Sequence, residues 1–457
     1  MRTAVVCTGT GTAGAYHAGV LRALTEAGIK IDIFAGRGVG AVAALFGAVD
    51  RGASLWDADG LWRDQPGLGR LYRWRWPWRM LAVLLLAALL ALLTPLLAIL
   101  AVAVTYPVAL VLQLAAGAGG TAAARRLFEF AAVVQDPAWF GNWVPRLVTL
   151  VLVGAVASIV VLTIRQRSQG LQRRSRDSVL WRALGAPFDG AVAARWIRAS
   201  FWRHLKGVVA IAEPTAADLS KRYADLLAEN LGQPGYGELM IVAHDLDAQR
   251  DIVFALLAEP YRRTFFGDAA SGEAGGRRAE LVDLAGLGQG HVADAVGASL
   301  SVPIATEPHL MTYPLDSFWR GETHRLHDRT DALARLLQEL SAAGVEQVVL
   351  VSADPALDGP HALRPVVFEP RRRFGEWLAS AETAAVRDAT SALFDRFSGV
   401  FHVRPVHNPL GPFDLLGAYD EHSDRPFDLT ELIARGYEDA YRQFVEPIVG
   451  EAAHDEA

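Results

Sequence analysis

A glycine-rich segment near the N-terminus contains the residue types that bind anions. Thr8-Gly9-Thr10-Gly11-Thr12-Ala13-Gly14 follows a short apolar run and precedes an amphipathic one. Glycine permits positive φ angles, and backbone N–H groups at a helix N-terminus can face an anion. Three interpretations are open: a dinucleotide site in which Gly9-x-Gly11-x-x-Gly14 holds a pyrophosphate, an oxyanion hole for an acyl oxygen, or a plain tight turn.

A second turn of small residues follows the next apolar run. Residues 31–35 lead into Gly36-Arg37-Gly38-Val39-Gly40 and then into an alanine-rich run. Small residues around a sharp strand-to-helix turn are typical of the nucleophile elbow, Gly-x-Ser-x-Gly. A dinucleotide-binding chain would instead have an acidic residue at the end of this strand, although Arg37 could hold the 2′-phosphate of NADP. Arg37 is therefore a candidate ligand contact, and an NADP-dependent oxidoreductase stays an alternative.

Thiol and metal chemistry are not indicated. Cys7 is the only cysteine, which excludes an internal disulfide and a multi-thiolate zinc site. His324 and His327 stand in a predicted strand, without the helical His-Glu-x-x-His context of zinc hydrolases. We expect neither a metal nor a cofactor.

Taken in order, these motifs resemble the patatin-like phospholipase family. Residues 8–21 are similar to that family's glycine-rich oxyanion loop and first helix, and residues 36–40 stand where its elbow is expected. Residues 298–303 are similar to the helix end before the catalytic aspartate, and residues 321–328 to the strand that carries it. The resemblance covers roughly residues 1–60 and 190–355. It implies a three-layer α/β/α fold with a mostly parallel sheet, and a lipid acyl hydrolase with a Ser–Asp dyad.

The departures from the family pattern fall on its catalytic residues. The serine would stand at Gly38, which has no nucleophile, and Asp328 is followed by Arg329 and Thr330 where the family has glycine or alanine. Loss of a nucleophilic serine typically lowers the rate thousands- to millions-fold. The resemblance therefore implies a dyad aspartate at Asp328, a missing nucleophile at Gly38, and impaired catalysis. The implied oxyanion or anion-binding residues are Gly9, Thr10, Gly11 and Gly14.

Strand and helix patterns alternate through most of the chain. Strand-like apolar runs occupy residues 3–7, 30–35, 239–244, 251–256 and 347–352. Amphipathic helical patterns occupy residues 14–27, 41–49, 216–231 and 331–343, and the tail is mainly helical. This alternation predicts an α/β fold with a mostly parallel sheet that is covered on both faces.

Two long uncharged runs interrupt this pattern, at residues 80–116 and 147–164. A bilayer crossing needs about 20 apolar residues, so we expect a transmembrane hairpin. Two crossings are favoured, and four stay open. The excess length of the first run fits a kinked helix or a re-entrant piece near Pro95 or Pro107.

The flanks of these runs predict the orientation. Arginines precede the first run and follow the second, at positions 63, 70, 73, 75 and 79 and at 165, 167, 173, 174 and 176. Basic residues near spans favour the cytoplasmic side, so both ends are expected there. Two groups of tryptophans would form the interfacial belts: Trp74, Trp76 and Trp78, and Trp139 and Trp143. The N-terminal apolar run is too short for a signal peptide.

The composition agrees with a protein that lies partly in lipid. Of 457 residues, 52% are hydrophobic and 21% charged, and the formal net charge is −6. Soluble domains carry about 25% charged residues. The negative charge argues against nucleic-acid binding.

We therefore expect four segments: residues 1–70 and 181–360 as the two parts of a patatin-like domain, residues 71–180 as a transmembrane insertion, and residues 361–457 as a mainly helical extension. The expected protein is a multi-pass member of the inner membrane of a bacterial-type cell, with its α/β domain in the cytoplasm. Its expected partners are membrane lipids and a second copy packed through the hairpin. The expected role is a lipid- or anion-binding regulator or scaffold. An active hydrolase with another nucleophile, or with a water activated by Asp328, stays an alternative.

Overall fold

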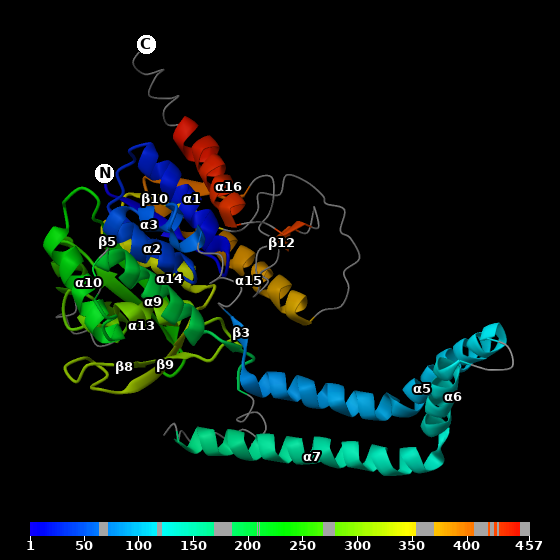
Figure 1. The fold of residues 1–457 in the computed structure, drawn as a ribbon. Coiled ribbons are helices and arrows are strands. Elements are labelled where there is room, and N and C mark those ends of the chain that lie inside the picture. The colour runs from blue at the N-terminus through cyan, green and yellow to red at the C-terminus, as the bar shows by residue number, and fades with distance from the viewer. Residues whose placement is uncertain are drawn as a thin grey trace. The chain divides into compact units, whose positions relative to one another are not determined.

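A nine-stranded sheet forms the centre of the α/β part of the chain, with strand order β11-β10-β1-β2-β5-β6-β7 and with β9 joining β5 to β8. The structure is a computed structural model (Figure 1), and it describes residues 1–63, 72–116, 121–168, 185–207, 209, 211–267, 279–352, 370–405, 419–420, 425–426 and 429–447. The strands are β1 (Thr3–Cys7), β2 (Ile33–Gly36), β5 (Glu238–Asp245), β6 (Arg250–Leu256), β7 (Leu281–Asp283), β8 (His309–Thr312), β9 (Thr323–His327), β10 (Gln347–Val351) and β11 (Gly399–Val403).

The five strands from β11 to β5 run parallel, and β6 and β9 run antiparallel to β5. The central strands β1 and β10 have the sequences TAVVC and QVVLV, and nearly all of their residues are buried. Near-continuous apolar runs of this kind belong to strands that are covered on both faces. The prediction of an α/β fold with a mostly parallel sheet is confirmed.

Helices cover both faces of the sheet. Alternate residues of a strand point to opposite faces, so each face presents apolar side chains that pack against helices. Val5 and Cys7 of β1 face the layer of α1 (Ala13–Glu26), α2 (Gly40–Asp50), α9 (Ala191–Lys206), α10 (Ala216–Asn230), α13 (Val292–Ser299) and α16 (Leu429–Ala440). Ala4 and Val6 face the layer of α14 (Ala332–Ala342) and α15 (Pro370–Leu393).

Shorter elements complete this part of the chain. They are α3 (Ala53–Trp56), α11 (Tyr261–Gly267), the 3₁₀ turns η1 (Leu61–Arg63), η4 (Gln289–His291) and η5 (Phe394–Arg396), the π-helical turn η6 (Tyr441–Val445), and the strands β3 (Arg73–Trp74), β4 (Phe188–Asp189), β12 (Tyr419–Asp420) and β13 (Arg425–Pro426).

The C-terminal segment, predicted from the sequence as a mainly helical extension at residues 361–457, packs as part of the α/β unit. Strand β11 adds to the sheet in parallel with β10, and α16 lies along α1 (Figure 1). The contact between α1 and α16 is close, since a Cβ on Gly436 would overlap the carbonyl oxygen of Tyr16. The Tyr16 hydroxyl also donates to Asp439 at 3.1 Å. The pairing depends on segments hundreds of residues apart, which local sequence patterns do not reveal.

The insertion forms its own compact unit, Trp74–Pro187. It contains α5 (Trp76–Ala116), α6 (Ala122–Gln135) and α7 (Pro137–Ser168). Two of its helical segments, Trp76–Ala116 and Gly141–Ser158, are long and apolar enough to cross a membrane. Helix α5 has 41 residues with Pro95 and Pro107 in its interior. At 1.5 Å per residue it measures about 60 Å, roughly twice the thickness of a bilayer core.

Within the insertion, α5 contacts both other helices. Figure 1 shows α5 running beside α7 and then bending away to lie beside α6. The rings of Tyr106 on α5 and Phe128 on α6 lie 5.3 Å apart, and a Cβ on Gly154 of α7 would lie 3.3 Å from Leu84 of α5. The side chains of the predicted flanking arginines at 70, 73, 165, 167, 173, 174 and 176, and that of Trp139, lie outside the described residues.

The contact between α1 and α16 can be tested with Gly436→Ala. Alanine is favoured over glycine in a helix by about 1 kcal/mol, but overlap of its Cβ with the Tyr16 carbonyl should instead lower the free energy of unfolding by about 1–3 kcal/mol. Urea unfolding of the full chain in detergent measures this change. The control is Gly267→Ala in α11, where the added Cβ meets no atom closer than 3.9 Å. Equal stability of the two variants would contradict the close packing.

Candidate active site

The candidate residues meet at the carboxyl edge of the sheet. Cys7, Gly36 and Val351 lie in register on β1, β2 and β10, so the loops that follow these strands begin side by side. The chain leaves β1 toward β2 on one side and later returns to β10 on the other. This makes the carboxyl end of β1 a topological switch point, the place where open α/β sheets bind ligands.

The turn between β2 and α2 has the backbone of an elbow but no nucleophile. Gly38 has a φ of +56°, the left-handed conformation that favours glycine. A Cβ at Gly38 would lie 3.2 Å from Oδ2 of Asp328. Asp328 follows β9, and its backbone N–H donates to the Ser301 carbonyl at 2.9 Å. The aspartate therefore lies where a serine side chain at position 38 would meet it.

The glycine loop occupies the space next to the elbow. The Gly9 carbonyl accepts a hydrogen bond from the Val39 N–H at 2.9 Å. The same oxygen would overlap a Cβ placed on Gly38. The Val39 amide is therefore engaged within the protein, and the nucleophile position faces a carbonyl oxygen, which is a hydrogen-bond acceptor.

The rest of the loop leads into α1. Gly9 and Gly11 have φ values of +137° and +58°. Thr10 and Gly11 are half-buried, and within the described part of the chain their N–H groups have no acceptor. Gly14 packs against the ring of Trp62, which a Cβ would overlap. Of the predicted anion-binding residues, Thr10 and Gly11 thus present free donors, while Gly14 faces a buried indole.

Arg37 is fully buried and holds two carboxylates. Its Nε and Nη2 lie 3.2 and 2.8 Å from the oxygens of Asp328. Its Nη1 and Nη2 lie 2.5 and 2.9 Å from the oxygens of Glu382. The Thr8 hydroxyl accepts from Nη1 at 2.8 Å and donates to Glu382. Both oxygens of the Asp328 carboxylate therefore face an arginine.

This network keeps the guanidinium charged. Burial lowers the pKa of Arg37, but the charges and hydrogen bonds of Asp328 and Glu382 raise it by more. Loss of one partner from a buried ion pair leaves an uncompensated charge, which is strongly destabilising. A ligand could reach Arg37, the predicted contact residue, only by displacing one of these carboxylates.

Glu382 is the member of this network that the sequence motifs do not reveal. It lies in α15 on the buried stripe that also contains Leu378, Val386, Ala389 and Leu393. These positions repeat at intervals of three and four residues, as on the core-facing side of a helix. An acidic residue on such a stripe requires a buried partner. The position of Glu382 on this stripe predicts that it forms a buried ion pair, but it does not indicate that Arg37 is the partner.

Two reactive side chains beside the loop are held in neutral forms. Burial raises the pKa of the Cys7 thiol far above its usual range, so the thiol is a poor nucleophile. The Nε2 of His17 lies 3.0 Å from the Thr8 carbonyl, and burial lowers the pKa of His17 to about 4. Neither group supplies the chemistry that is missing from the elbow.

The family model of the patatin-like phospholipases matches residues 5–319. The chain belongs to the patatin-like phospholipase family. The matched range contains the glycine loop and Gly38 and ends before Asp328. Among solved structures, VipD from Legionella pneumophila is similar at 12% identity with a TM-score of 0.31, covering 97% of this chain and 66% of that chain. Among curated proteins, no sequence matches.

Compared with the Ser–Asp dyad of patatin-like phospholipases, this member has an aspartate and an elbow backbone but no hydroxyl between them. Arg37, which is also paired with Glu382, donates hydrogen bonds to both oxygens of Asp328. The Gly9 carbonyl lies against the elbow at Gly38.

A hydroxyl–imidazole pair lies on the other side of the glycine loop. Ser352 follows β10, and its Oγ lies 2.8 Å from Nε2 of His402 on β11. Burial, and secondarily the charge of Arg404, lowers the pKa of His402 to about 4, so the imidazole is neutral near pH 7. Ser352 is fully buried. No motif marks this pair, because its members are 50 residues apart and meet only through strand pairing.

The histidines of β9 have protein partners. Nδ1 of His324 lies 2.5 Å from Oδ2 of Asp245, and the ring of His327 lies 5.3 Å from that of His244. Among the described residues, no group of three or more histidine, cysteine or acidic side chains could hold a metal ion.

The buried network predicts a large effect of Arg37→Met. The variant leaves Asp328 and Glu382 buried without a countercharge, so the free energy of unfolding should fall by about 3–5 kcal/mol. Urea unfolding of the full chain measures this. The control is Arg22→Met, which removes one partner of the half-exposed Arg22–Glu26 pair at 2.8 Å and should change stability by less than about 1 kcal/mol. A loss no larger than that of the control would show that the network is not formed.

Proposed function

We propose that this protein is a membrane-anchored member of the patatin-like phospholipase family that lacks acyl-hydrolase chemistry and acts as a lipid- or anion-binding regulator or scaffold. One observation carries this proposal: the position of the nucleophile is Gly38, and the groups beside it are already engaged. Asp328 binds Arg37, and the Val39 amide binds the Gly9 carbonyl.

The same contacts weigh against two alternatives. A water activated by Asp328 needs access to the carboxylate, but Asp328 is buried and both of its oxygens accept hydrogen bonds from Arg37. An NADP site needs Arg37 to face a phosphate, but its guanidinium is buried between two carboxylates. Binding without turnover needs neither group. The N–H groups of Thr10 and Gly11, which have no acceptor among the described residues, offer donors to an anion.

Exposed apolar side chains support the membrane anchor. In α5, Leu92 is 79% exposed and Leu114 is 75% exposed, and in α7 Leu150 is 71% exposed. Continuous apolar surface of this kind is rare on soluble monomers. Together with the arginine-rich flanks, it favours a multi-pass protein of the inner membrane with its α/β domain in the cytoplasm. The alanine- and glycine-containing spans would also allow a second copy to pack closely.

Cysteine labelling tests the anchor and its orientation, because Cys7 is the only native cysteine. Lys30→Cys and Thr121→Cys are placed separately in a Cys7→Ala background. For two crossings, a membrane-impermeant maleimide should label Lys30→Cys only in inverted membrane vesicles, and Thr121→Cys only in intact spheroplasts. Labelling of both positions from the same side, or release of the protein by alkaline carbonate, would contradict the proposed topology.

Turnover tests the loss of chemistry. Wild-type protein in lipid nanodiscs should release acid from short-chain nitrophenyl esters and from phospholipid no faster than empty nanodiscs do. Gly38→Ser should stay at that rate, because its Cβ overlaps the Gly9 carbonyl and Asp328 is engaged. An active patatin-like phospholipase serves as the positive control. A wild-type rate above background that Asp328→Asn removes would overturn the proposal.

The Ser352–His402 pair favours a second candidate function, an acyl hydrolase whose nucleophile is Ser352. His402 would accept the hydroxyl proton as Oγ attacks the acyl carbonyl. A fluorophosphonate probe separates the two candidates. The main proposal predicts no labelling of the wild type. Labelling that is lost in Ser352→Ala and kept in the buried-serine control Ser301→Ala would establish the second candidate instead.

A further inference from the structure

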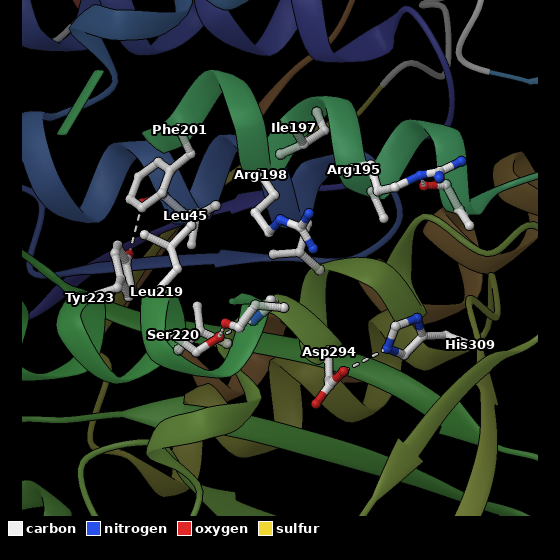
Figure 2. Close-up of a pocket in the computed structure, with 16 residues that line it drawn as sticks. Leu45, Arg195, Ile197, Arg198, Phe201, Leu219, Ser220, Tyr223, Asp294 and His309 are labelled. Atoms are coloured by element: carbon white, nitrogen blue, oxygen red, sulfur yellow. Dashed lines mark hydrogen bonds and ion pairs between the residues drawn. The ribbon is translucent and has the colours of Figure 1, made fainter. Parts of the chain in front are cut away.

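An apolar cavity of about 170 Å³ lies between α9, α10 and α13. Figure 2 shows α9 on one side of it, with Phe201, Leu45 and Leu219 at one end and Asp294 with His309 at the other. Most of its lining is aliphatic or aromatic. None of the lining residues belongs to the Arg37 network or to the glycine loop, so the cavity is separate from the candidate active site.

Two arginines of α9 line this cavity. Figure 2 shows Arg198 extending from α9 toward the space between α9 and α10. Its Nε lies 2.7 Å from Glu213, and both side chains of this pair are about one-third exposed. The Nε of Arg195 donates to the Ala191 carbonyl at 3.2 Å, and in the described part of the chain Arg195 has no acidic partner. An apolar space with an uncompensated guanidinium suits a ligand with an apolar chain and an anionic end.

The acidic side chain of the cavity does not cancel this preference, because Asp294 is already paired. Its two oxygens lie 2.7 Å from Nδ1 of His291 and 2.8 Å from Nε2 of His309. Burial raises the pKa of Asp294, but these hydrogen bonds lower it by more. The carboxylate is therefore held within the protein. Arg195 is the arginine that an incoming anion meets first, and Arg198 can join it where the anion takes the place of Glu213.

We infer that this cavity binds the chain of a single-chain amphiphile whose anionic head group, a carboxylate or a phosphate, pairs with Arg195 and Arg198. The inference rests on the proposed function, for which it supplies a lipid site. A dry protein cavity of about 150 Å³ holds a benzene molecule, so this one accommodates a chain segment of about six to eight carbons. The cavity should therefore take up most of the chain of a medium-chain amphiphile, whereas it should not hold the two chains of a phospholipid.

The test uses a decanoic acid that carries a diazirine on its chain, photolysed with the full chain in lipid nanodiscs. Mass spectrometry should place the label on peptides of α9, α10 and α13. Decanoate and decyl phosphate should compete with it, whereas inorganic phosphate and decyltrimethylammonium should not. Competition by inorganic phosphate alone would show a free-anion site. Equal competition by the cationic amphiphile would show that the arginines do not select the head group.

Variants separate the head-group contacts from the chain site. Arg195→Gln and Arg198→Gln should each raise the half-competition concentration of decanoate about tenfold, the loss expected for a hydrogen bond to a charged group. Lys221→Gln, an exposed residue of α10 outside the cavity, should leave it unchanged. Leu219→Trp should fill the cavity and abolish labelling. Ala194→Leu, at a half-buried lining position, should weaken labelling without disturbing the fold.

Two outcomes would overturn the inference: labelling confined to peptides of residues 74–187, or labelling that none of the cavity variants changes. These outcomes are distinct from failure of the proposed function. Ester turnover by the wild type would overturn the proposed function and leave the label map intact. Absence of turnover, with the label outside the cavity, would overturn only the inference.

Discussion

The buried guanidinium of Arg37 is the interaction on which the rest of the site depends. It joins the turn after β2, the loop after β9 and the middle of α15 by pairing with Asp328 and Glu382. A charge in such a place is tolerated only with full compensation, because its desolvation costs several kcal/mol. Arg37 therefore ties Asp328 and Glu382, from two distant segments, to the turn after β2. Both oxygens of Asp328 accept hydrogen bonds from Arg37 in this arrangement.

A second constraint, of main-chain packing, acts at the same place. The elbow and the glycine loop approach so closely that the Gly9 carbonyl receives the Val39 amide and excludes any side chain from Gly38. The glycine at position 38 is thus required by its positive φ and also by this close approach. Two independent contacts therefore occupy the surroundings of the elbow: the ion pair of Arg37 with Asp328, and the close approach of the Gly9 carbonyl to Gly38. Its backbone nevertheless makes a sharp strand-to-helix turn with a left-handed glycine at position 38.

The sequence motifs located the parts of the site that lie within one segment. The glycine loop and the small-residue turn at residues 36–40 were predicted from local spacing, and the roles of Gly38 and Asp328 from the family resemblance. The structure brings Gly38 and Asp328 together as the family resemblance implies. The contacts between distant segments were not predictable in the same way. Glu382 reaches Arg37 across 345 residues, and Ser352 meets His402 only because β10 and β11 pair.

The C-terminal segment shows the same limit at the level of the fold. Its helical periodicity was visible, but its membership of the sheet through β11 was not, because a five-residue strand carries little local signal. The central claim, that Arg37 holds Asp328, is tested most directly by a double-mutant cycle. The free energy of unfolding is measured for wild type, Arg37→Met, Asp328→Asn and the double variant. If Arg37 holds Asp328, the coupling energy between the two positions should be about 1–3 kcal/mol. Additive effects would contradict it and would leave Asp328 free for chemistry.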